Sequence, residues 1–347
     1  MTAMEPPFRA VPFEGPDAEW DRLVASMPGS DFCHLAAWRR IMSDVLGHQT
    51  HYSLALDASG EPGGVLPLVR VRSRLFGDYL VSMPFLSYGG PLGPPAAQRA
   101  LAAHAITLAG QLGVDLLELR GRFEPPEPLA PSSRKITVLL DLPDTADELW
   151  EKGLKSKLRS QIRRPMKEGM TTEFGSGLVD DFYAVFSRTM RDLGTPVLPR
   201  RFFEAVAERF PDQALFGVVR HDGEPVAAGC GFLWNGEAEI TWAGADRRVS
   251  RLAPNMLLYW SFMAETVARG GSVFNFGRCT PGSGTHRFKR QWGGRDVPLP
   301  WGQWSASAVD ATPSPDSAKF RLATRTWSRL PVAVANRLGP PLARLLP

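Results

Sequence analysis

One pattern that occurs twice constrains the fold of this chain more than any other feature. The stretches LAGQLGVDLLELRG (108–121) and ETVARGGSVFNFGR (265–278) each run from a helix tail through a glycine stop into an apolar strand, then to a glycine beside an arginine. Strand-like segments joined by short turns belong to each half of the chain. We therefore predict two α/β units in tandem, with hairpins at their centres.

The boundaries of these units follow from local signals. Leu142–Thr145 is typical of a linker followed by a helix cap, so we predict domains at 1–142 and 143–308 and a C-terminal tail at 309–347. Asn235-Gly236 is the strongest hairpin signal. Apolar spacing predicts helices at 17–27, 34–46, 95–112, 154–167, 180–191, 200–210 and 254–269, and strands at 51–57, 64–72, 114–120, 135–142, 214–220, 226–234, 237–244 and 272–277.

Composition excludes several classes of protein. With 347 residues, of which 44% are hydrophobic, the chain can build a real core and is not disordered. Three cysteines without CxxC spacing indicate neither a disulfide framework nor a zinc site, and the six histidines show no ligand spacing, so we expect no metal. No signal peptide and no run of about 18 apolar residues is present. We therefore expect a cytoplasmic protein that is neither exported nor membrane-spanning.

The net charge of +4 conceals two basic segments. Residues 151–169 hold seven basic and two acidic side chains, and residues 313–347 hold six basic and one acidic, so each segment carries +5 and the remainder about −6. Arg159 and Arg163 lie in the first segment and are candidate contacts to an anionic substrate; the alternative is an ordinary solvated helix face. Pro165 is expected to kink or end this helix near Arg164.

The segment 274–294 is the richest in candidate site residues. Glycines 277, 282 and 284 lie near Arg278, Arg287 and Lys289, so backbone N–H groups and cations can meet a phosphate or an oxyanion there. The spacing matches neither a Walker A loop nor a dinucleotide-binding fingerprint. The alternative is a plain glycine-rich turn.

Two further segments leave alternatives open. Tyr88 lies in SMPFLSYGGP, which is either a rigid pocket wall or a packed turn. The tail combines arginines with aromatic residues, so it either docks on the protein body or lies at an anionic membrane surface.

Several of these motifs together resemble a known family over nearly the whole chain. GTPV (194–197), HDG (221–223), PVAA (225–228), NMLLYW (255–260), SKLRSQIRRPMKEGM (156–170), VSMPFLSYGGP (81–91), VANRLGPPLARLLP (334–347) and above all FNFGRCTPGSGTHRFKRQWGG (274–294) resemble the FemAB-related proteins of exosortase/PEP-CTERM exopolysaccharide systems. The resemblance implies an α/β (α+β) fold with tandem GCN5-related acetyltransferase-like domains, each a mixed, largely antiparallel sheet flanked by helices. The Fem aminoacyltransferases have this architecture.

The resemblance also implies a reaction centre. In the wider family a lysine within F-K-x-x-[FW]-G steadies phosphate or developing charge, and Lys289 matches it here. We assign Lys289, Arg278 and Tyr259 to catalysis. The predicted substrate-binding residues are Arg287, Thr241, Asp246, Asn255, Gly277, Gly282, Gly284, Arg159, Arg163 and Tyr88.

The predicted function is an acyl- or aminoacyltransferase that forms an amide on a cell-envelope or exopolysaccharide precursor, with acyl-CoA or aminoacyl-tRNA as donor and an anionic or lipid-linked sugar precursor as acceptor. Residues 247–253 lack the glycines of the usual acetyltransferase pyrophosphate loop, and no long charged heptad insertion of the tRNA-associated kind is present. The alternatives are an acetyl-CoA-dependent N-acetyltransferase and a non-catalytic scaffold of the export machinery. If the tail lies at a membrane surface instead of docking on the protein body, it would place the protein at the inner face of the membrane.

Overall fold

The computed structural model describes residues 8–306 and 318–346, so the predicted tail residues 309–317 and 347 lie outside the described part. The described chain divides into two compact units. The first contains residues 8–135, 298–306 and 344–346, and the second contains residues 136–297 and 318–343. The strands β6 (Ala130–Asp141) and β12 (Arg295–Trp304) each pass from one unit to the other.

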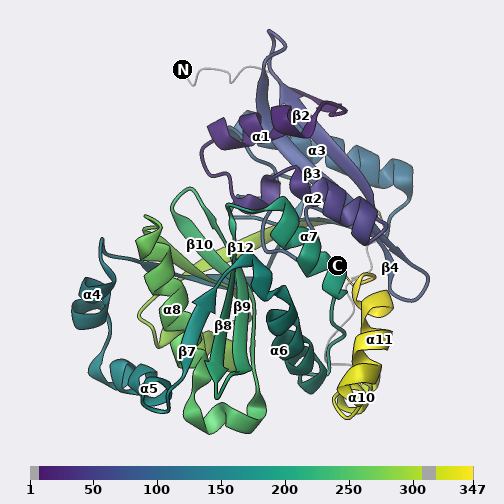
Figure 1. The fold of residues 1–347 in the computed structure, drawn as a ribbon. Helices are drawn as coiled ribbons and strands as arrows, with labels where there is room; N and C mark the ends of the chain where they lie inside the picture. Colours follow the sequence, from purple (N-terminus) through teal and green to yellow (C-terminus); the bar gives the residue numbers. More distant parts are fainter. Residues whose placement is uncertain (1–7, 307–317, 347) are drawn as a thin grey trace. The chain divides into compact units, whose positions relative to one another are not determined.

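The first unit is a mixed sheet with the strand order β1-β2-β3-β4-β5-β12. Among the described strand pairs of this unit, β4 and β5 are parallel, and α3 (Figure 1) lies between them in the chain. Gly113, at φ +64°, ends α3 as the sequence predicts. The bounds are β1 Arg9–Pro12, β2 Gln49–Leu56, β3 Pro62–Ser73, β4 Gly77–Val81 and β5 Leu116–Leu119, with the helices α1 Asp17–Ser26, α2 Ala37–Arg40 and α3 Pro95–Leu112.

The second unit repeats this plan with the strand order β6-β11-β10-β9-β8-β7. Among its described pairs, β10 with β11 is again parallel, and α8 lies between these two strands in the chain. The strands are β7 Thr171–Phe174, β8 Ala214–His221, β9 Glu224–Trp234, β10 Glu237–Ala245 and β11 Val273–Cys279. The α-helices are α4 Ala146–Glu148, α5 Ser156–Lys167, α6 Val179–Asp192, α7 Arg200–Arg209, α8 Pro254–Ala268, α9 Gly284–Arg290, α10 Ala318–Trp327 and α11 Val332–Ala343.

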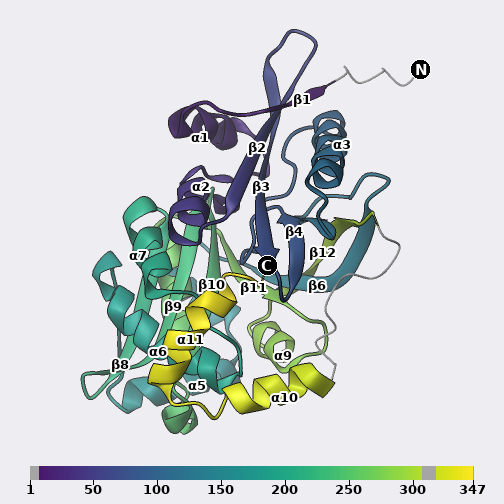
Figure 2. The same cartoon turned by 90° about the vertical axis from the view of Figure 1, so that its right-hand side faces the viewer.

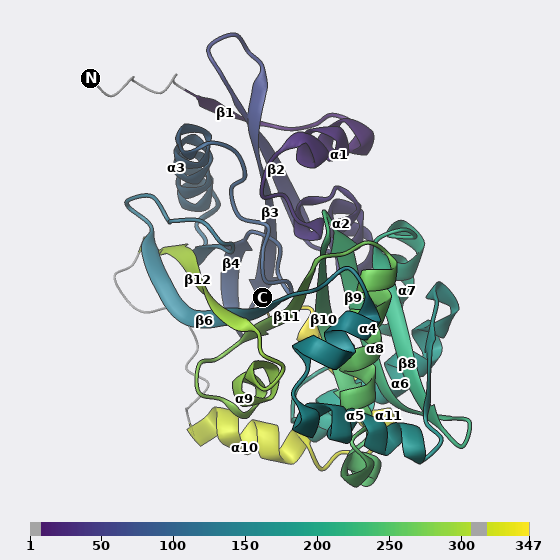
Figure 3. The same ribbon diagram turned by 90° about the vertical axis from the view of Figure 1, so that its left-hand side faces the viewer.

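Helices cover both faces of the second sheet. A Cβ built on Gly229 of β9 would meet Phe262 of α8, whereas one built on Gly244 of β10 would meet Thr189 of α6. Gly229 and Gly244 point to opposite faces, because the residue paired with Gly244 is Ala228. The helices α4 and α5 pack against α8 on its side of the sheet (Figure 3).

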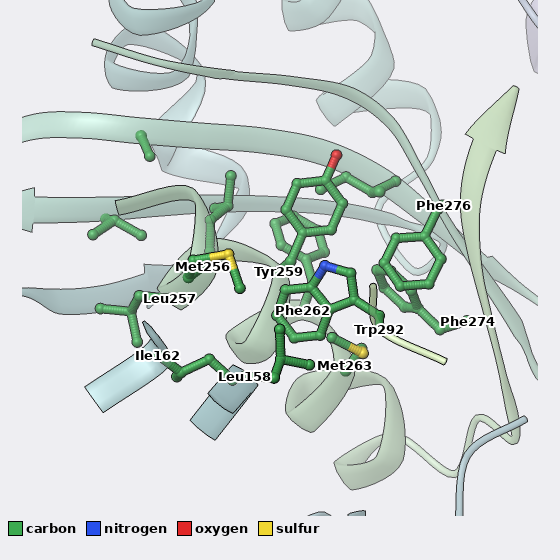
Figure 4. Close-up of a cluster of buried hydrophobic side chains, with 14 of the residues drawn as sticks. Leu158, Ile162, Met256, Leu257, Tyr259, Phe262, Met263, Phe274, Phe276 and Trp292 are labelled. Carbon is green, nitrogen blue, oxygen red and sulfur yellow. The ribbon is translucent and has the colours of Figure 1, made fainter. Parts of the chain in front are cut away.

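The core between α8 and the sheet is strongly aromatic (Figure 4). Tyr259 of α8 stacks on Phe276 of β11 with 5.8 Å between ring centroids, and Trp292, which follows α9, packs beside both. Large buried rings of this kind stabilise a core by several kcal/mol each when compared with alanine, about 3–5 kcal/mol for Phe or Trp. They also fix α9 against β11, which positions the candidate site.

The C-terminal helix α11 packs on α6 (Figure 2). Its buried residues Ala335, Gly339 and Ala343 recur every four positions and form one face. The Asn336 side chain donates to the Ser187 hydroxyl at 3.1 Å, and Arg191 of α6 donates to the carbonyl oxygen of Leu330 at 2.7 Å. Part of the predicted tail therefore docks on the second unit.

The mixed, largely antiparallel α/β fold is confirmed, and so is the hairpin at Asn235-Gly236, where both residues have positive φ. Three local predictions are only partly right. The predicted helix 34–46 is a 3₁₀ turn, the short α2 and a π-helical turn at Ile41–Val45. The helix with Pro165 continues to Lys167, three residues beyond Arg164, although Pro165 cannot donate to the carbonyl oxygen four residues before it. The predicted glycine-rich loop is mostly the end of β11 and the helix α9.

Candidate functional site

The candidate site begins where the parallel strands β10 and β11 stop pairing. Their register runs from Glu237 beside Val273 to Glu239 beside Asn275, although β10 continues to Ala245 and β11 to Cys279. Just beyond this point each strand shifts register against its other neighbour, between Ile240 and Trp242 in β10 and between Asn275 and Arg278 in β11. Such irregularities re-aim side chains and backbone groups, and they are frequent next to active sites.

Asn275 ties three strands together at this point. Its amide nitrogen donates to the carboxylates of Glu237 at 2.7 Å and Glu239 at 3.0 Å. Its amide oxygen accepts from the Thr137 hydroxyl of β6 at 2.5 Å and from the backbone N–H of Gly277 at 2.8 Å. Asn275 is fully buried, so these bonds hold the shifted backbone of β11 in one conformation.

Lys289 of α9 reaches this shifted backbone. Its ammonium donates to the carbonyl oxygens of Gly277 at 2.7 Å and Arg278 at 2.9 Å, and the residue is only 4% exposed. Burial lowers the pKa of Lys289 to about 8, while the charge of Glu239 acts to raise it. An ammonium has three N–H donors, and two are directed to the carbonyl oxygens.

Because Gly277 has no side chain, strand β10 and the side chains of Glu239 and Lys289 can lie close to the backbone of β11. Its φ is +71°, in the left-handed region, and an added Cβ would lie 3.1 Å from the carbonyl oxygen of Ile240. The same Cβ would lie 3.8 Å from the Glu239 carboxylate and 3.9 Å from the Lys289 nitrogen. Gly277 is thus surrounded by the two strands and by both charged groups.

The other predicted residues of this region surround the same point. Thr241 donates to the Glu239 carboxylate at 3.3 Å, and Arg278 is half-buried at the end of β11. Tyr259 lies in the aromatic core, where burial raises the pKa of its phenol, so the group stays protonated at neutral pH. The structure therefore brings together Lys289, Gly277, Arg278 and Thr241.

The residues at the start of α9 are more exposed. Ser283 caps the helix by accepting from the N–H of His286, and Gly284 is its first residue. Arg287 is exposed and donates to the carbonyl oxygen of Gly282 at 2.8 Å, which closes the turn on itself. Gly282 and Arg287 thus shape the turn that leads into α9.

Asp246 and Asn255 flank the segment where an acetyltransferase would carry its pyrophosphate loop. Asp246 caps the 3₁₀ helix Arg247–Leu252, accepts from the N–H and guanidinium of Arg248, and has its pKa lowered by these bonds. The N–H groups of Val249 and Ala253 also donate within the turn. The negative cap and the bonded N–H groups of Arg248, Val249 and Ala253 disfavour a pyrophosphate at this turn. Asn255 is half-buried in the first turn of α8.

A cavity of about 470 Å³ opens on the α6 side of this turn. Both signs of charge line it, since Arg188 lies 3.6 Å from Asp246, and Asp246 also pairs with Arg248. Its lining comes from α6, from the β8–β9 turn and from the end of β10: Ala184, Val185, Arg188, His221, Asp222, Glu224, Pro225, Val226, Asp246, Arg248 and Val249.

The two arginines predicted on the basic helix α5 have structural partners. Arg159 donates to the carbonyl oxygens of Trp150, Glu151 and Leu154 at 2.8–3.0 Å and so fastens the start of α5 to the preceding turn. Arg163 lies over the ring of Trp150 at 5.1 Å. Arg163 is exposed and Arg159 is half-buried.

Tyr88 belongs to the first unit, where its hydroxyl accepts from Arg122 at 2.9 Å and its ring lies under the same guanidinium.

The position in the first unit that is equivalent to Gly277 is occupied by an arginine. The last parallel pair there is Val81 with Glu118, and two residues further on lies Arg120 instead of a glycine.

Arg120 is 4% exposed, and its side chain lies where the parallel strands β4 and β5 stop pairing. It donates to Glu118 at 2.7 Å and lies over the ring of Trp301 at 4.7 Å, while Gln303 donates to the other Glu118 oxygen at 2.6 Å. The first unit thus closes this position with its own side chains.

Sequence reasoning missed Glu239, Asn275 and Thr137. A signal was present, because Glu237 and Glu239 alternate within the predicted strand EAEITWAG and Asn275 interrupts the apolar run VFNF. Polar side chains in segments that should be buried point to a hydrogen-bonded network. Among the described residues, no group of three or more His, Cys, Asp or Glu side chains is placed to hold a metal ion.

Comparison with known proteins shows which folds this chain is similar to. The model of the acetyltransferase (GNAT) domain family matches residues 154–290. No curated protein sequence matches the chain. Among solved structures, FemX superposes with a TM-score of 0.64 at 14% identity, over 85% of this chain and 97% of FemX.

Two other solved structures are similar. The C-terminal domain of a protein described as a lysylphosphatidylglycerol synthetase from Agrobacterium fabrum has a TM-score of 0.57 at 17% identity, over 85% of this chain and 94% of its own. L-PGS from Bacillus licheniformis has a TM-score of 0.55 at 12% identity, over 92% and 99%. The chain therefore has a GNAT-like fold, and the GNAT-matching segment contains the site around Lys289.

Proposed function

We propose that the protein is an acyl- or aminoacyltransferase that forms an amide bond. The observation that carries the proposal is the buried Lys289 ammonium, which is fixed by two carbonyl oxygens at the point where β10 and β11 stop pairing. Its third N–H has no hydrogen-bond partner among the described residues. A preorganised cation in a site that excludes water stabilises developing negative charge far more than it would in water.

The chemistry needs two things from the protein. An amine attacks the acyl carbonyl, and the tetrahedral intermediate carries an oxyanion until the leaving group departs with the electron pair. Lys289 would supply the charge opposite that oxyanion or the donor's phosphate. Arg278, half-buried one residue beyond Gly277, would supply a second anion contact.

The capped turn after β10 is relevant to the choice of acyl donor. Because Asp246 and the local hydrogen bonds of residues 248–253 occupy the place of a pyrophosphate loop, we propose aminoacyl-tRNA rather than acyl-CoA as the donor. The sequence resemblance to the Fem aminoacyltransferases supports this choice. The same turn also favours a second candidate function, a scaffold that has lost catalysis.

The acceptor we propose is a cell-envelope or exopolysaccharide precursor. Its support is the sequence resemblance to FemAB-related proteins of exosortase/PEP-CTERM systems and the similarity to FemX and to a protein described as a lysylphosphatidylglycerol synthetase. None of the described helices combines the length and apolar composition that crossing a bilayer requires.

The proposal is tested by transfer of label. Purified full-length protein would be incubated with envelope extract and either labelled aminoacyl-tRNA or labelled acetyl-CoA. We expect alkali-stable label, as an amide, from aminoacyl-tRNA, and loss of that label in Lys289→Ala. Lys157→Ala, an exposed lysine of α5, is the matched control and should transfer normally.

Each donor result has a distinct meaning. Label from acetyl-CoA alone would replace the proposed donor but keep the reaction class. No label from either donor, together with normal polysaccharide export in a Lys289→Ala strain, would exclude catalysis and leave the scaffold.

A further inference from the structure

The C-terminal helices present a second surface that the transfer reaction does not use. We name it the arginine–leucine face; its residues are Leu322, Arg325, Arg329, Val334, Arg337 and Leu338. All six are exposed, with Leu322 at 67% and Leu338 at 49%. The face lies on α10, on the turn that follows it and on α11 (Figure 2).

The helix α10 points its leucine away from the protein. Thr324 is on the side that meets the body, because a Cβ on Gly194 would lie 2.3 Å from its methyl carbon. At 100° per residue, Leu322 lies about 160° and Arg325 about 100° from Thr324 around the helix. The exposed side of α10 therefore carries an aliphatic side chain and a cation, and the exposed Arg329 follows in the turn after the helix.

The helix α11 has the same division. Ala335, Gly339 and Ala343 form its buried face, and a Cβ on Gly339 would lie 3.1 Å from the backbone nitrogen of Val197. Arg337 and Val334 lie on the opposite side, with Leu338 at its edge. Docking on α6 thus accounts for the small residues on the buried face of α11. It does not account for the arginine and the aliphatic side chains on the exposed face.

The charge of this surface is of one sign. Residues 321–346 contain five arginines and neither aspartate nor glutamate. Arg325, Arg329 and Arg337 form no ion pair with any described residue. An ordinary surface helix mixes signs and hides its leucines, so both departures occur together here.

The combination identifies the class of partner. Phosphate groups of a nucleic acid would satisfy the arginines but would give no reason to expose leucine and valine. A bilayer with anionic headgroups satisfies both, because arginines contact the phosphates while aliphatic side chains enter the boundary between headgroups and acyl chains. We propose that the arginine–leucine face binds the surface of an anionic lipid bilayer.

The test is co-sedimentation of the full-length protein with vesicles. We expect binding to phosphatidylcholine vesicles that contain phosphatidylglycerol, weakening with salt, and no binding to phosphatidylcholine alone. Replacing Arg325, Arg329 and Arg337 together with Gln should weaken binding about 100-fold, at about fivefold per arginine. Leu322→Ser with Leu338→Ser should weaken it about tenfold at low salt, where charge is intact.

The control is an exposed pair elsewhere in the chain. Arg74 and Leu75 are exposed in the β3–β4 turn, with Leu75 at 77%, so Arg74→Gln with Leu75→Ser should bind vesicles like the unaltered protein. Circular dichroism would show that all variants keep their fold, which is expected because every altered side chain is on the surface.

Three outcomes would overturn the proposal. They are equal binding to neutral and anionic vesicles, equal weakening by the control pair, and binding that the leucine variants leave unchanged. If the last outcome came with tRNA binding that the arginine variants abolish, the partner would be a nucleic acid. None of these outcomes bears on Lys289, so the two proposals fail separately.

Discussion

The ammonium of Lys289 and the carbonyl oxygen of Gly277 are joined by a 2.7 Å hydrogen bond between α9 and β11. The acceptor belongs to a left-handed residue, and the amide of that same residue is held by Asn275. One hydrogen-bonded chain therefore runs from the two carboxylates of β10 through Asn275 and Gly277 to the lysine. A change at any member should be felt at Lys289.

The pH dependence of transfer should show the titration of Lys289. If its ammonium stabilises the transition state, the rate should fall as pH rises through about 8, the lowered pKa of this group. Lys289→Ala should lower the transfer rate by about 10²–10³-fold. The pH profile of this variant should also lack the decrease in rate at alkaline pH. Steady-state rates across pH would show this; an unaltered alkaline limb in the variant would assign the titration to another group.

Replacing Glu239 with Gln should shift that limb to lower pH. The negative charge of Glu239 raises the pKa of Lys289, so its removal lets the lysine lose its proton earlier. Glu237→Gln is the matched control, because Glu237 accepts from the same Asn275 amide. Equal displacement of the limb by both variants would contradict a specific Glu239–Lys289 interaction.

Gly277→Ala should be more damaging than Gly282→Ala. Both glycines have φ near +70°, at +71° and +75°, so the backbone strain of an alanine is about 1 kcal/mol at each. Only at Gly277 would the new methyl group meet backbone, 3.1 Å from the Ile240 carbonyl oxygen. Urea unfolding should give a larger loss for Gly277→Ala, with transfer lost as well; similar losses at both sites would show that strain alone matters.

The stability of the protein should rise between pH 8 and pH 10 relative to Lys289→Met. Lys289 has a folded-state pKa of about 8 against an ordinary value of 10.5, so in this window the unfolded chain binds more protons than the folded one. The gain should reach up to about 3 kcal/mol, at 1.4 kcal/mol per unit of pKa. Melting temperatures of both proteins across pH would measure it, and a constant difference would mean that Lys289 is not desolvated.

Local signals predicted much of the fold. The glycine stops at Gly113 and Gly270-Gly271 end helices that connect parallel strands in both units, and Asn235-Gly236 forms its hairpin, because these turns need left-handed residues. The strand β12 was not predicted. Pro298 and Pro300 disguise it, and its partner β5 lies more than 170 residues away in sequence.

The candidate site was predictable in part for the same reason. Lys289 and Gly277 stand in one motif, so the sequence alone could place them together. Thr137 and Asn275 are 138 positions apart and meet only because β6 pairs with β11. Long-range pairing of this kind has no local signature.

Arg120 in the first unit has a consequence for the stoichiometry of binding. It takes up the place that Gly277 leaves open in the second unit, and its guanidinium is neutralised by Glu118 beneath the ring of Trp301. A titration with a saturating donor analogue should therefore reach its equivalence point at one molecule per polypeptide, although the polypeptide carries the fold twice.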